Sequence, residues 1–244
     1  MSQSYDAQSA ESIYEYSKLL TNKTLAQVAG LTDSEENLPN KGNLGVLVEK
    51  HFFKHEPPNT PDPDFPDAKF IISDEYGHRS YTGLEVKTTG ITKKKKEFKA
   101  KERLVLTKIN YKDIVKETWE TSHFLKKCQL MLIIFYLYEK EKKVVDRKFV
   151  IDPMLFEIAI PEEELAQIKT DWEKIRQKVL EGKAHELSEG DTFYLGACTK
   201  GATKEDSTSQ PYNETPAKPR AFSFKVGYTN KVLNRHISAL EAKK

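Results

Sequence analysis

Three charged side chains have the types and the order that hydrolysis of a phosphodiester requires. In the strand-like segment GLEVK, side chains alternate between two faces, so Glu85 and Lys87 share one face while Leu84 and Val86 point to the other. Asp64 precedes this segment in a proline-rich stretch. Two carboxylates suit a hard cation, which polarises a phosphoryl oxygen and activates water, while the lysine orients that water or offsets charge on the phosphate. The pattern predicts metal-dependent phosphodiester hydrolysis.

A predicted helix upstream carries further residues at four-residue spacing. Apolar positions recur at helical spacing in NKGNLGVLVEKHFF, from about residue 42 to residue 53. Lys41, Gly45 and Glu49 therefore lie along one side, and the glycine lets another backbone or a ligand approach closely. A Glu-x-Lys pair by itself also fits an exposed ion pair worth well under about 1 kcal/mol. The proline-bound aspartate, the alternating strand and this helix favour the catalytic interpretation.

The composition is that of a folded protein with one domain, or with two lobes that share a core. Of 244 residues, 38% are hydrophobic and 31% are charged, which excludes a disordered chain. The longest apolar run, LMLIIFYLY, is too short for a bilayer, which needs about 20 residues, and the polar N-terminus has no signal-peptide pattern. Cys128 and Cys198 form no metal-binding motif and indicate a reducing compartment. We therefore expect a cytoplasmic protein with no zinc site and no membrane segment.

Basic residues gather in two parts of the sequence, although the net charge is only +2. The first set consists of Lys93, Lys94, Lys95, Lys96, Lys99, Lys101 and Arg103. The second set, near the end of the chain, consists of Lys218, Arg220, Lys225, Lys231 and Arg235. Such sets are either solvated surface or contacts to nucleic-acid phosphates, whose binding releases counterions. Charge alone leaves both interpretations open.

Hydrophobic periodicity and turn residues predict a mixed central β-sheet flanked by helices, an α/β (α+β) fold. The unbroken apolar run QLMLIIFYLYE predicts a central strand covered on both faces. Pro161, the glutamates after it and Gly182 predict the start, first turn and end of a long helix. Further helices are expected within residues 8–30 and at 228–240, strands at 103–111, 148–160 and 221–226, a hairpin within 69–87, and loops at 56–67 and 197–219.

Seven blocks follow one another in an order that resembles a known family. They are KGNLGVLVEK, PDF, GLEVKT, ETWETSH, DWEKIRQKVLEGKAHEL, YLGACTKGA and RAFSFKVGY. In this order they resemble the mismatch-repair nicking endonuclease MutH and related type II restriction enzymes that recognise GATC. The resemblance covers roughly residues 24–237. It implies a restriction-endonuclease-like fold with a PD-(D/E)xK site, in one endonuclease domain over residues 1–244, with a catalytic lobe at about 24–150 and a DNA-recognition lobe at about 155–237.

The resemblance also implies roles for individual residues. The implied residues are Asp64, Glu85 and Lys87 in the catalytic core, Glu49 and Val86 with Asp64 and Glu85 at the metal, and Lys41 and Lys127 as supporting basic residues. The implied cofactor is Mg²⁺, with Mn²⁺ as a substitute. Trp119 and His123, just before Lys127, fit either a part of the site or strand-edge packing and a capping turn, whereas Trp172 and its helix fit a scaffold.

One departure from the family concerns the first carboxylate. Family members place the aspartate only a few residues before the Glu-x-Lys pair, whereas here residues 69–82 intervene. A hairpin in this insert leaves both ends in place. The insert also opens Asp62, Asp67 and Asp74 as alternatives. We retain Asp64, because the local Pro-Asp-Phe pattern matches there.

A second departure concerns the residues that read DNA. The implied DNA-binding residues are Cys198, Thr199, Lys200, Gly201, Arg220, Ser223 and Lys225. Cys198 stands where the repair enzyme has an arginine; Lys200 is kept, and lysine serves guanine O6 and N7 without the arginine fork. Ser223 stands where the repair enzyme has a tyrosine near the target adenine, and a serine leaves room for a methyl group. The chain therefore looks more like the restriction branch.

The resemblance leaves three hypotheses about function. The first is a type II restriction endonuclease that cuts double-stranded DNA at GATC and is insensitive to adenine methylation, as a monomer or as a homodimer on the palindrome. The second is a mismatch-repair nickase of hemimethylated GATC, switched on by MutL. The third is a DNA-binding or effector domain of a larger restriction enzyme that does not cleave, against which the intact Asp64, Glu85 and Lys87 argue.

Overall fold

The fold is taken from a computed structural model, which describes residues 5–31, 43–54, 83–95, 97–159, 161–200 and 206–243. The chain divides into two compact units. Unit 1 draws on the segments Met1–Glu102, Leu130–Phe156 and Leu233–Lys244, and unit 2 on Arg103–Gln129 and Glu157–Val232. Each unit is thus assembled from segments that are distant in the sequence. Several predictions fall outside the described residues: Lys41, Asp62, Asp64, Asp67, Asp74, the hairpin in 69–82, and Gly201.

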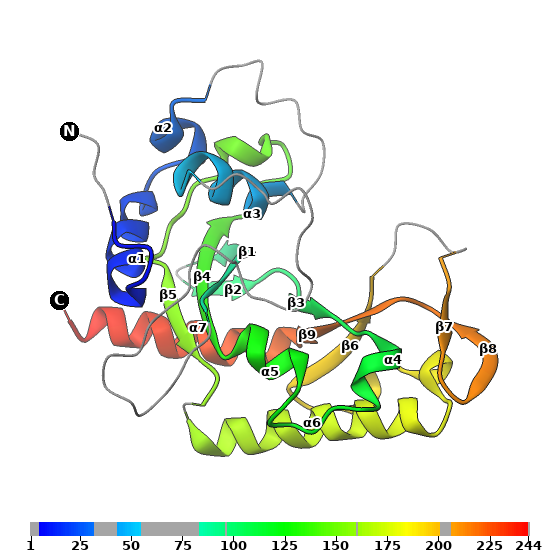
Figure 1. Cartoon of the computed structure of the whole chain (residues 1–244). Helices are drawn as coiled ribbons and strands as arrows, with labels where there is room; N and C mark the ends of the chain where they lie inside the picture. Colours follow the sequence, from blue (N-terminus) through cyan, green and yellow to red (C-terminus); the bar gives the residue numbers. More distant parts are fainter. Residues whose placement is uncertain are drawn as a thin grey trace. The chain divides into compact units, whose positions relative to one another are not determined.

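Unit 1 contains a mixed sheet with the strand order β2-β1-β4-β5 (Figure 1). Its strands are β1 (Glu85–Lys94), β2 (Glu97–Ala100), β4 (Leu130–Leu137) and β5 (Met154–Glu157). β1 and β4 run parallel, with Glu85 opposite Met131, and β1 and β2 run antiparallel. All of β4 except its last residue is buried, because both faces are covered. The predicted central strand is confirmed.

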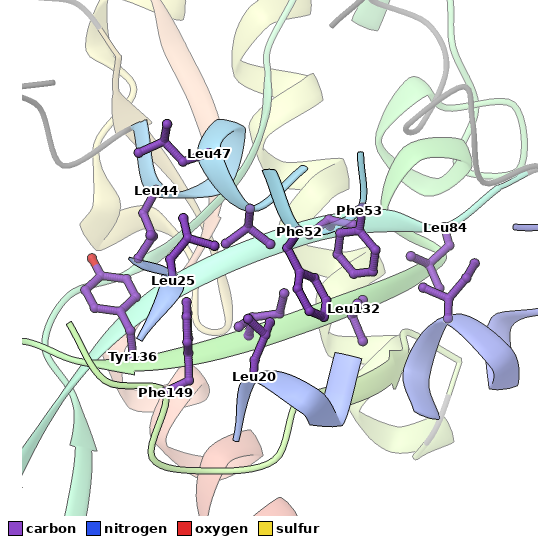
Figure 2. Packing of buried hydrophobic residues seen from close by; sticks show 14 of the residues in the cluster. Leu20, Leu25, Leu44, Leu47, Phe52, Phe53, Leu84, Leu132, Tyr136 and Phe149 are labelled. Atoms are coloured by element: carbon purple, nitrogen blue, oxygen red, sulfur yellow. The ribbon is translucent and has the colours of Figure 1, made fainter. Parts of the chain in front are cut away.

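Short helices cover one face of this sheet. They are α1 (Ala10–Ser17), the 3₁₀ turn η1 (Lys18–Leu20), α2 (Leu25–Ala29), α3 (Asn43–Leu47), the π-helical turn η2 (Val48–Phe52) and the 3₁₀ turn η3 (Val144–Asp146). Thr24 caps α2 in a capping box, and Gly30 ends it in the left-handed conformation that glycine adopts without strain. Figure 2 shows leucines of α2 and α3 packed with Leu84 and Leu132 of the sheet region. This cluster holds α3 on β1.

Unit 2 contains a second, three-stranded sheet with the order β3-β9-β6. Its strands are β3 (Leu104–Lys108), β9 (Arg220–Phe224) and β6 (Leu195–Thr199). The helices are α4 (Tyr111–Ile114), α5 (His123–Cys128), α6 (Glu162–Leu180) and α7 (Val226–Glu241), with 3₁₀ turns η4 (Ala184–Glu186) and η5 (Glu189–Asp191). α7 begins in unit 2, and its residues from Leu233 onward belong to unit 1. The long helix predicted between Pro161 and Gly182 is confirmed.

Two parts of the chain differ from the predicted elements. The predicted loop at 197–219 is wrong, because a hairpin forms there from β7 (Thr208–Gln210) and β8 (Asn213–Ala217) (Figure 1). The sequence pattern did not predict this hairpin, because β8 is exposed up to its last residue and its side chains show no apolar alternation. The strand predicted at the end of the 69–87 hairpin runs further than expected, because β1 continues to Lys94 and pairs with β2, so that Lys93, Lys94 and Lys99 lie in a β1–β2 hairpin. No helix in the described ranges is long and apolar enough to cross a membrane.

Candidate active site

Glu85 and Lys87 lie side by side at the beginning of β1. The Lys87 ammonium donates a hydrogen bond to Glu85 Oε1. Their neighbours Leu84 and Val86 belong to the hydrophobic cluster that faces the helices of unit 1. The predicted alternation of GLEVK is therefore present: the apolar pair anchors the strand, and the charged pair shares its other face.

Burial distinguishes this pair from an exposed ion pair. The side chains of Glu85 and Lys87 are only 7% and 16% exposed. Removing two charges from water is costly, and a buried ion pair adds little to stability compared with apolar side chains of the same size. The interpretation as a solvated surface pair does not fit these exposures. The pair is instead a buried ion pair on one face of β1.

The helical segment upstream contributes Glu49 and Gly45. Glu49 is half-buried and lies in the π-helical turn η2, a local widening of the helix that is frequent at functional sites. A Cβ at Gly45 would stand 3.4 Å from Thr88 Oγ1, so this glycine permits the close approach of α3 to β1. Thr88 is on the same face of β1 as Val86 and on the opposite face from Glu85 and Lys87. Gly45 therefore serves the packing of the helix on the strand.

The described carboxylates fit a hard cation but do not complete its site. Glu85 offers carboxylate oxygens, the ligand type that Mg²⁺ prefers, on a side chain that is 7% exposed. The side chain of Val86 is buried in the apolar cluster. Because a valine side chain has no oxygen or nitrogen, Val86 could bind a cation only through its main-chain carbonyl oxygen. Within the described ranges, no group of three His, Cys, Asp or Glu side chains comes together as a metal site. Asp64, the predicted second carboxylate, lies outside those ranges.

Lys127, Trp119 and His123 belong to unit 2. Lys127 is half-buried in the last turn of α5, which Ser122 caps through its hydroxyl. Trp119 is 7% exposed and packs edge-on against Trp172, with ring centroids 5.9 Å apart. His123 Nε2 lies 3.1 Å from Thr107 Oγ1 of β3. These contacts support the packing interpretation of Trp119 and the scaffold interpretation of Trp172.

The predicted recognition residues lie at one end of the β6–β9 pair. Thr199 is opposite Arg220, and Cys198 is opposite Ala221. Arg220 Nη1 donates a hydrogen bond to Thr199 Oγ1 at 2.9 Å, and the Lys200 main-chain N–H donates to Pro219 O at 2.9 Å. Thr199 and Lys200 are exposed, whereas Cys198 is only 2% exposed. The strands thus present Thr199, Lys200 and Arg220, and bury the Cys198 thiol.

Ser223 and Lys225 lie further along β9. Ser223 is opposite Gly196, is 1% exposed, and its Oγ has no hydrogen-bond partner among the described residues. The Lys225 ammonium donates to Thr192 O, and its side chain packs beside Gly196. The place beside Gly196 is taken by the Lys225 side chain, and Ser223 is buried.

A buried aspartate positions β6, and the sequence interpretation missed it. Asp171 of α6 accepts hydrogen bonds from the main-chain N–H groups of Phe193, Tyr194 and Leu195, at 2.9, 2.6 and 2.9 Å. Gln167 Nε2 donates a fourth at 3.0 Å. The signal was present, because position 171 lies on the buried stripe of α6 formed by residues such as Ile168 and Ile175. An aspartate in such a stripe needs hydrogen-bond partners.

The fold and the comparisons with known proteins agree on the class. The mixed sheet flanked by helices is consistent with a restriction-endonuclease-like fold, as predicted. Residues 53–171 match the family model described as "DNA mismatch repair enzyme MutH". The chain is 35% identical over 228 residues to the type II restriction enzyme Sau3AI of Staphylococcus aureus, covering 93% of this chain and 43% of that protein. It is 29% identical over 219 residues to the DNA mismatch repair protein MutH of Shewanella woodyi, covering 88% of this chain and 86% of that protein.

The chain is thus similar to the MutH and Sau3AI nucleases over most of its length. The MutH protein of Vibrio campbellii, 28% identical over 220 residues, is a further relative. The chain spans less than half the length of Sau3AI but most of the length of the MutH proteins. This similarity to two kinds of endonuclease supports a DNA endonuclease activity.

Proposed function

We propose that this protein is a type II restriction endonuclease that makes Mg²⁺-dependent double-strand cuts in DNA at GATC, whether or not the adenine is methylated. The observation that carries the proposal is the buried pair of Glu85 and Lys87 on β1. The similarity to Sau3AI over 93% of the chain supports restriction. The whole activity of that longer protein is taken here as a hypothesis, because the chain spans 43% of it.

Each catalytic residue has a proposed task. Glu85, with Asp64, Glu49 and the Val86 carbonyl, would hold Mg²⁺, which supplies Lewis acidity and a more acidic bound water. Lys87 holds its ammonium at the Glu85 carboxylate, where it can orient the attacking water and offset charge on the scissile phosphate. Lys41 and Lys127 would add positive charge around that phosphate. The products would carry a 5′-phosphate and a 3′-hydroxyl.

The recognition residues have a proposed task in unit 2. Thr199, Lys200 and Arg220, next to Cys198 and Gly201, would contact the bases and phosphates of double-stranded DNA. Ser223, a small residue where the repair enzyme has a tyrosine, would leave space for the N6-methyl group of adenine, and Lys225 would contact the DNA. A palindromic site suits a homodimer, in which each copy cuts one strand.

Mapping the cut ends tests this function. Plasmid DNA that is unmethylated, hemimethylated or fully adenine-methylated at GATC is incubated with the protein and Mg²⁺, and the ends are sequenced. The proposal predicts double-strand breaks at GATC in all three substrates and none with EDTA. Ends at other sequences, or protection of methylated DNA, would contradict it.

A mismatch-repair nickase is the second candidate. The observation in its favour is that the chain matches 86% of the length of two MutH proteins, against 43% of Sau3AI. On hemimethylated DNA, this candidate predicts nicks confined to the unmethylated strand. Specific GATC binding without cleavage in Mg²⁺ or Mn²⁺ would instead favour a non-cleaving DNA-binding domain.

A further inference from the structure

Arg147, which follows η3 in unit 1, buries two guanidinium nitrogens that have no hydrogen-bond partner in the described part of the chain. The residue is 5% exposed. Its Nε and Nη1 atoms are buried and have no partner among the described residues. Nearly all buried charged groups in proteins are paired or hydrogen-bonded, because water is no longer there to solvate them. The guanidinium therefore has unused donors inside the protein.

A second cation lies close to the same point. The Arg147 guanidinium carbon is 4.8 Å from the centre of the Tyr138 ring and 5.7 Å from that of Tyr136. Lys101 Nζ is 2.9 Å from the centre of the Tyr138 ring. Two positive charges thus share one aromatic ring, and no ion pair of the described residues involves either of them. Attraction to the ring does not remove the repulsion between the cations.

Main-chain hydrogen bonds fix this arrangement at the far end of β1. Lys101 N–H donates to Gly90 O at 2.9 Å, and Tyr138 N–H donates to Ile91 O at 2.8 Å. Leu137 N–H donates to Lys148 O at 2.8 Å, which holds the segment after Arg147 against β4. At a rise of about 3.3 Å per residue, Gly90 is roughly 17 Å along β1 from Glu85. The two cations are therefore separate from the candidate active site.

We propose that Arg147 and Lys101 form a binding site for a phosphate group. The planar guanidinium fork matches two oxygens of a tetrahedral phosphate, and an ammonium supplies a further donor. A phosphate bound by the Nη1/Nη2 fork would give Nη1 its acceptor and would neutralise the two facing charges, while the tyrosine rings form walls. Lys93, Lys94 and Lys99 on the exposed part of the same β1–β2 hairpin attract anions toward this end of the sheet. The phosphate is either free inorganic phosphate or a backbone phosphate of DNA, and only the second source rests on the proposed function.

Thermal unfolding of the full chain tests the site with inorganic phosphate as the probe. The wild type should gain several degrees in Tm as sodium phosphate replaces sodium chloride at constant ionic strength. Arg147→Met should lose this gain, and its Tm in chloride should equal or exceed that of the wild type, because a methionine fills the space without an unsatisfied charge. Lys101→Met should reduce the gain, and Lys140→Met, which removes an exposed cation from the nearby connection, should leave it unchanged.

Three results would overturn the phosphate site. These are the absence of a phosphate-dependent gain in the wild type, a full gain in Arg147→Met, or a Tm of Arg147→Met well below wild type in chloride. The last would mean that Arg147 stabilises the fold by itself.

The salt dependence of DNA binding distinguishes the two sources. Affinity for a GATC duplex is measured in Ca²⁺ over a range of NaCl concentrations for the wild type and Arg147→Met. A slope of log affinity against log salt that falls by about 0.9 in the variant assigns the site to a DNA phosphate. An unchanged slope, together with the Tm gain, assigns it to free phosphate. Failure of the proposed nuclease function would appear instead as no cleavage by the wild type, and would leave the Tm result intact.

Discussion

Asp171 Oδ2 accepts a hydrogen bond of 2.6 Å from the main-chain N–H of Tyr194, joining the middle of α6 to the residue that precedes β6. The same carboxylate receives the N–H groups of Phe193 and Leu195. Because β6 leads directly to Thr199 and Lys200, this carboxylate sets the position of the strand that presents the proposed recognition residues.

Removing this carboxylate should destabilise the protein strongly. Asp171→Ala leaves three main-chain N–H groups without an acceptor, and hydrogen bonds to a charged group are worth about 1.5–3 kcal/mol each. We expect the free energy of unfolding, measured by urea denaturation, to fall by at least about 3 kcal/mol. Glu173→Ala, at an exposed position of the same helix, should change it by less than about 0.5 kcal/mol. Equal stability of the two variants would show that these hydrogen bonds are not essential.

Tyr212 at the tip of the β7–β8 hairpin should be a site where glycine is more stable. Its φ is +64°, a left-handed conformation that costs a residue with a Cβ about 1–2 kcal/mol, and its side chain is 72% exposed. Tyr212→Gly removes this strain, while the greater entropy of glycine in the unfolded chain offsets part of the gain. The free energy of unfolding should therefore rise by no more than about 1 kcal/mol. Tyr212→Ala, which keeps the Cβ, should gain less. A loss of stability in the glycine variant would mean that the tyrosine ring makes a stabilising contact.

The stability of unit 1 should fall on mild acidification because of His236. Burial lowers the pKa of His236, while its hydrogen bond with Asp152 O acts in the opposite direction. The unfolded chain therefore takes up a proton first as the pH falls below the ordinary value of about 6.5. The contribution of neutral His236 to the free energy of unfolding is complete above that pH. This contribution is lost as the pH falls toward the lower pKa of His236 in the folded state.

Thermal unfolding at several pH values checks this dependence. The wild type should lose more Tm between pH 7.5 and pH 5 than His236→Gln does, while His185→Gln, at an exposed position, should follow the wild type. Identical pH profiles for the wild type and His236→Gln would rule out this histidine as the cause.

Lys200 should contribute to DNA affinity through charge. Lys200 is exposed and follows the last residue of β6, Thr199, which accepts a hydrogen bond from Arg220. Lys200→Met should weaken binding of a GATC duplex and lower the slope of log affinity against log salt by about 0.9 if it meets one phosphate. A larger loss for GATC than for other duplexes would indicate base contact. Lys174→Met, on the exposed side of α6, should match the wild type, and the idea fails if Lys200→Met does so too.

The sequence predicted those parts of the fold in which local pattern and burial agree. β4 is an unbroken apolar run because both of its faces are covered. GLEVK alternates because Leu84 and Val86 pack in the apolar cluster, while Glu85 and Lys87 share the other face of the strand. α6 was framed by Pro161 and Gly182, which act locally. These features depend on neighbours in the chain, so one sequence suffices to find them.

Other features depend on distant partners and could not be predicted. The β7–β8 hairpin consists of exposed polar residues held by Gln210, whose amide reaches Ala184 N and Thr215 O. Asp171 accepts hydrogen bonds from main-chain N–H groups at the start of β6, which is more than twenty residues away in the sequence, so its partners could not be predicted from neighbouring residues. The pairing of Glu85 with Lys87 was predictable from alternation, whereas the roles of Glu49, Lys127 and Ser223 came from resemblance and stay predictions.

The cleavage rate of Lys87→Met is the most direct test of the account. Single-turnover cutting of a GATC duplex in Mg²⁺ is compared with duplex binding in Ca²⁺, for the wild type, Lys87→Met and the control Lys93→Met, which changes an exposed lysine of the same strand. We predict that Lys87→Met cuts about 10²–10⁴-fold more slowly while binding within a few-fold of the wild type, and that Lys93→Met cuts normally. Cutting by Lys87→Met at the wild-type rate would contradict the assignment of the Glu85–Lys87 pair as the catalytic centre.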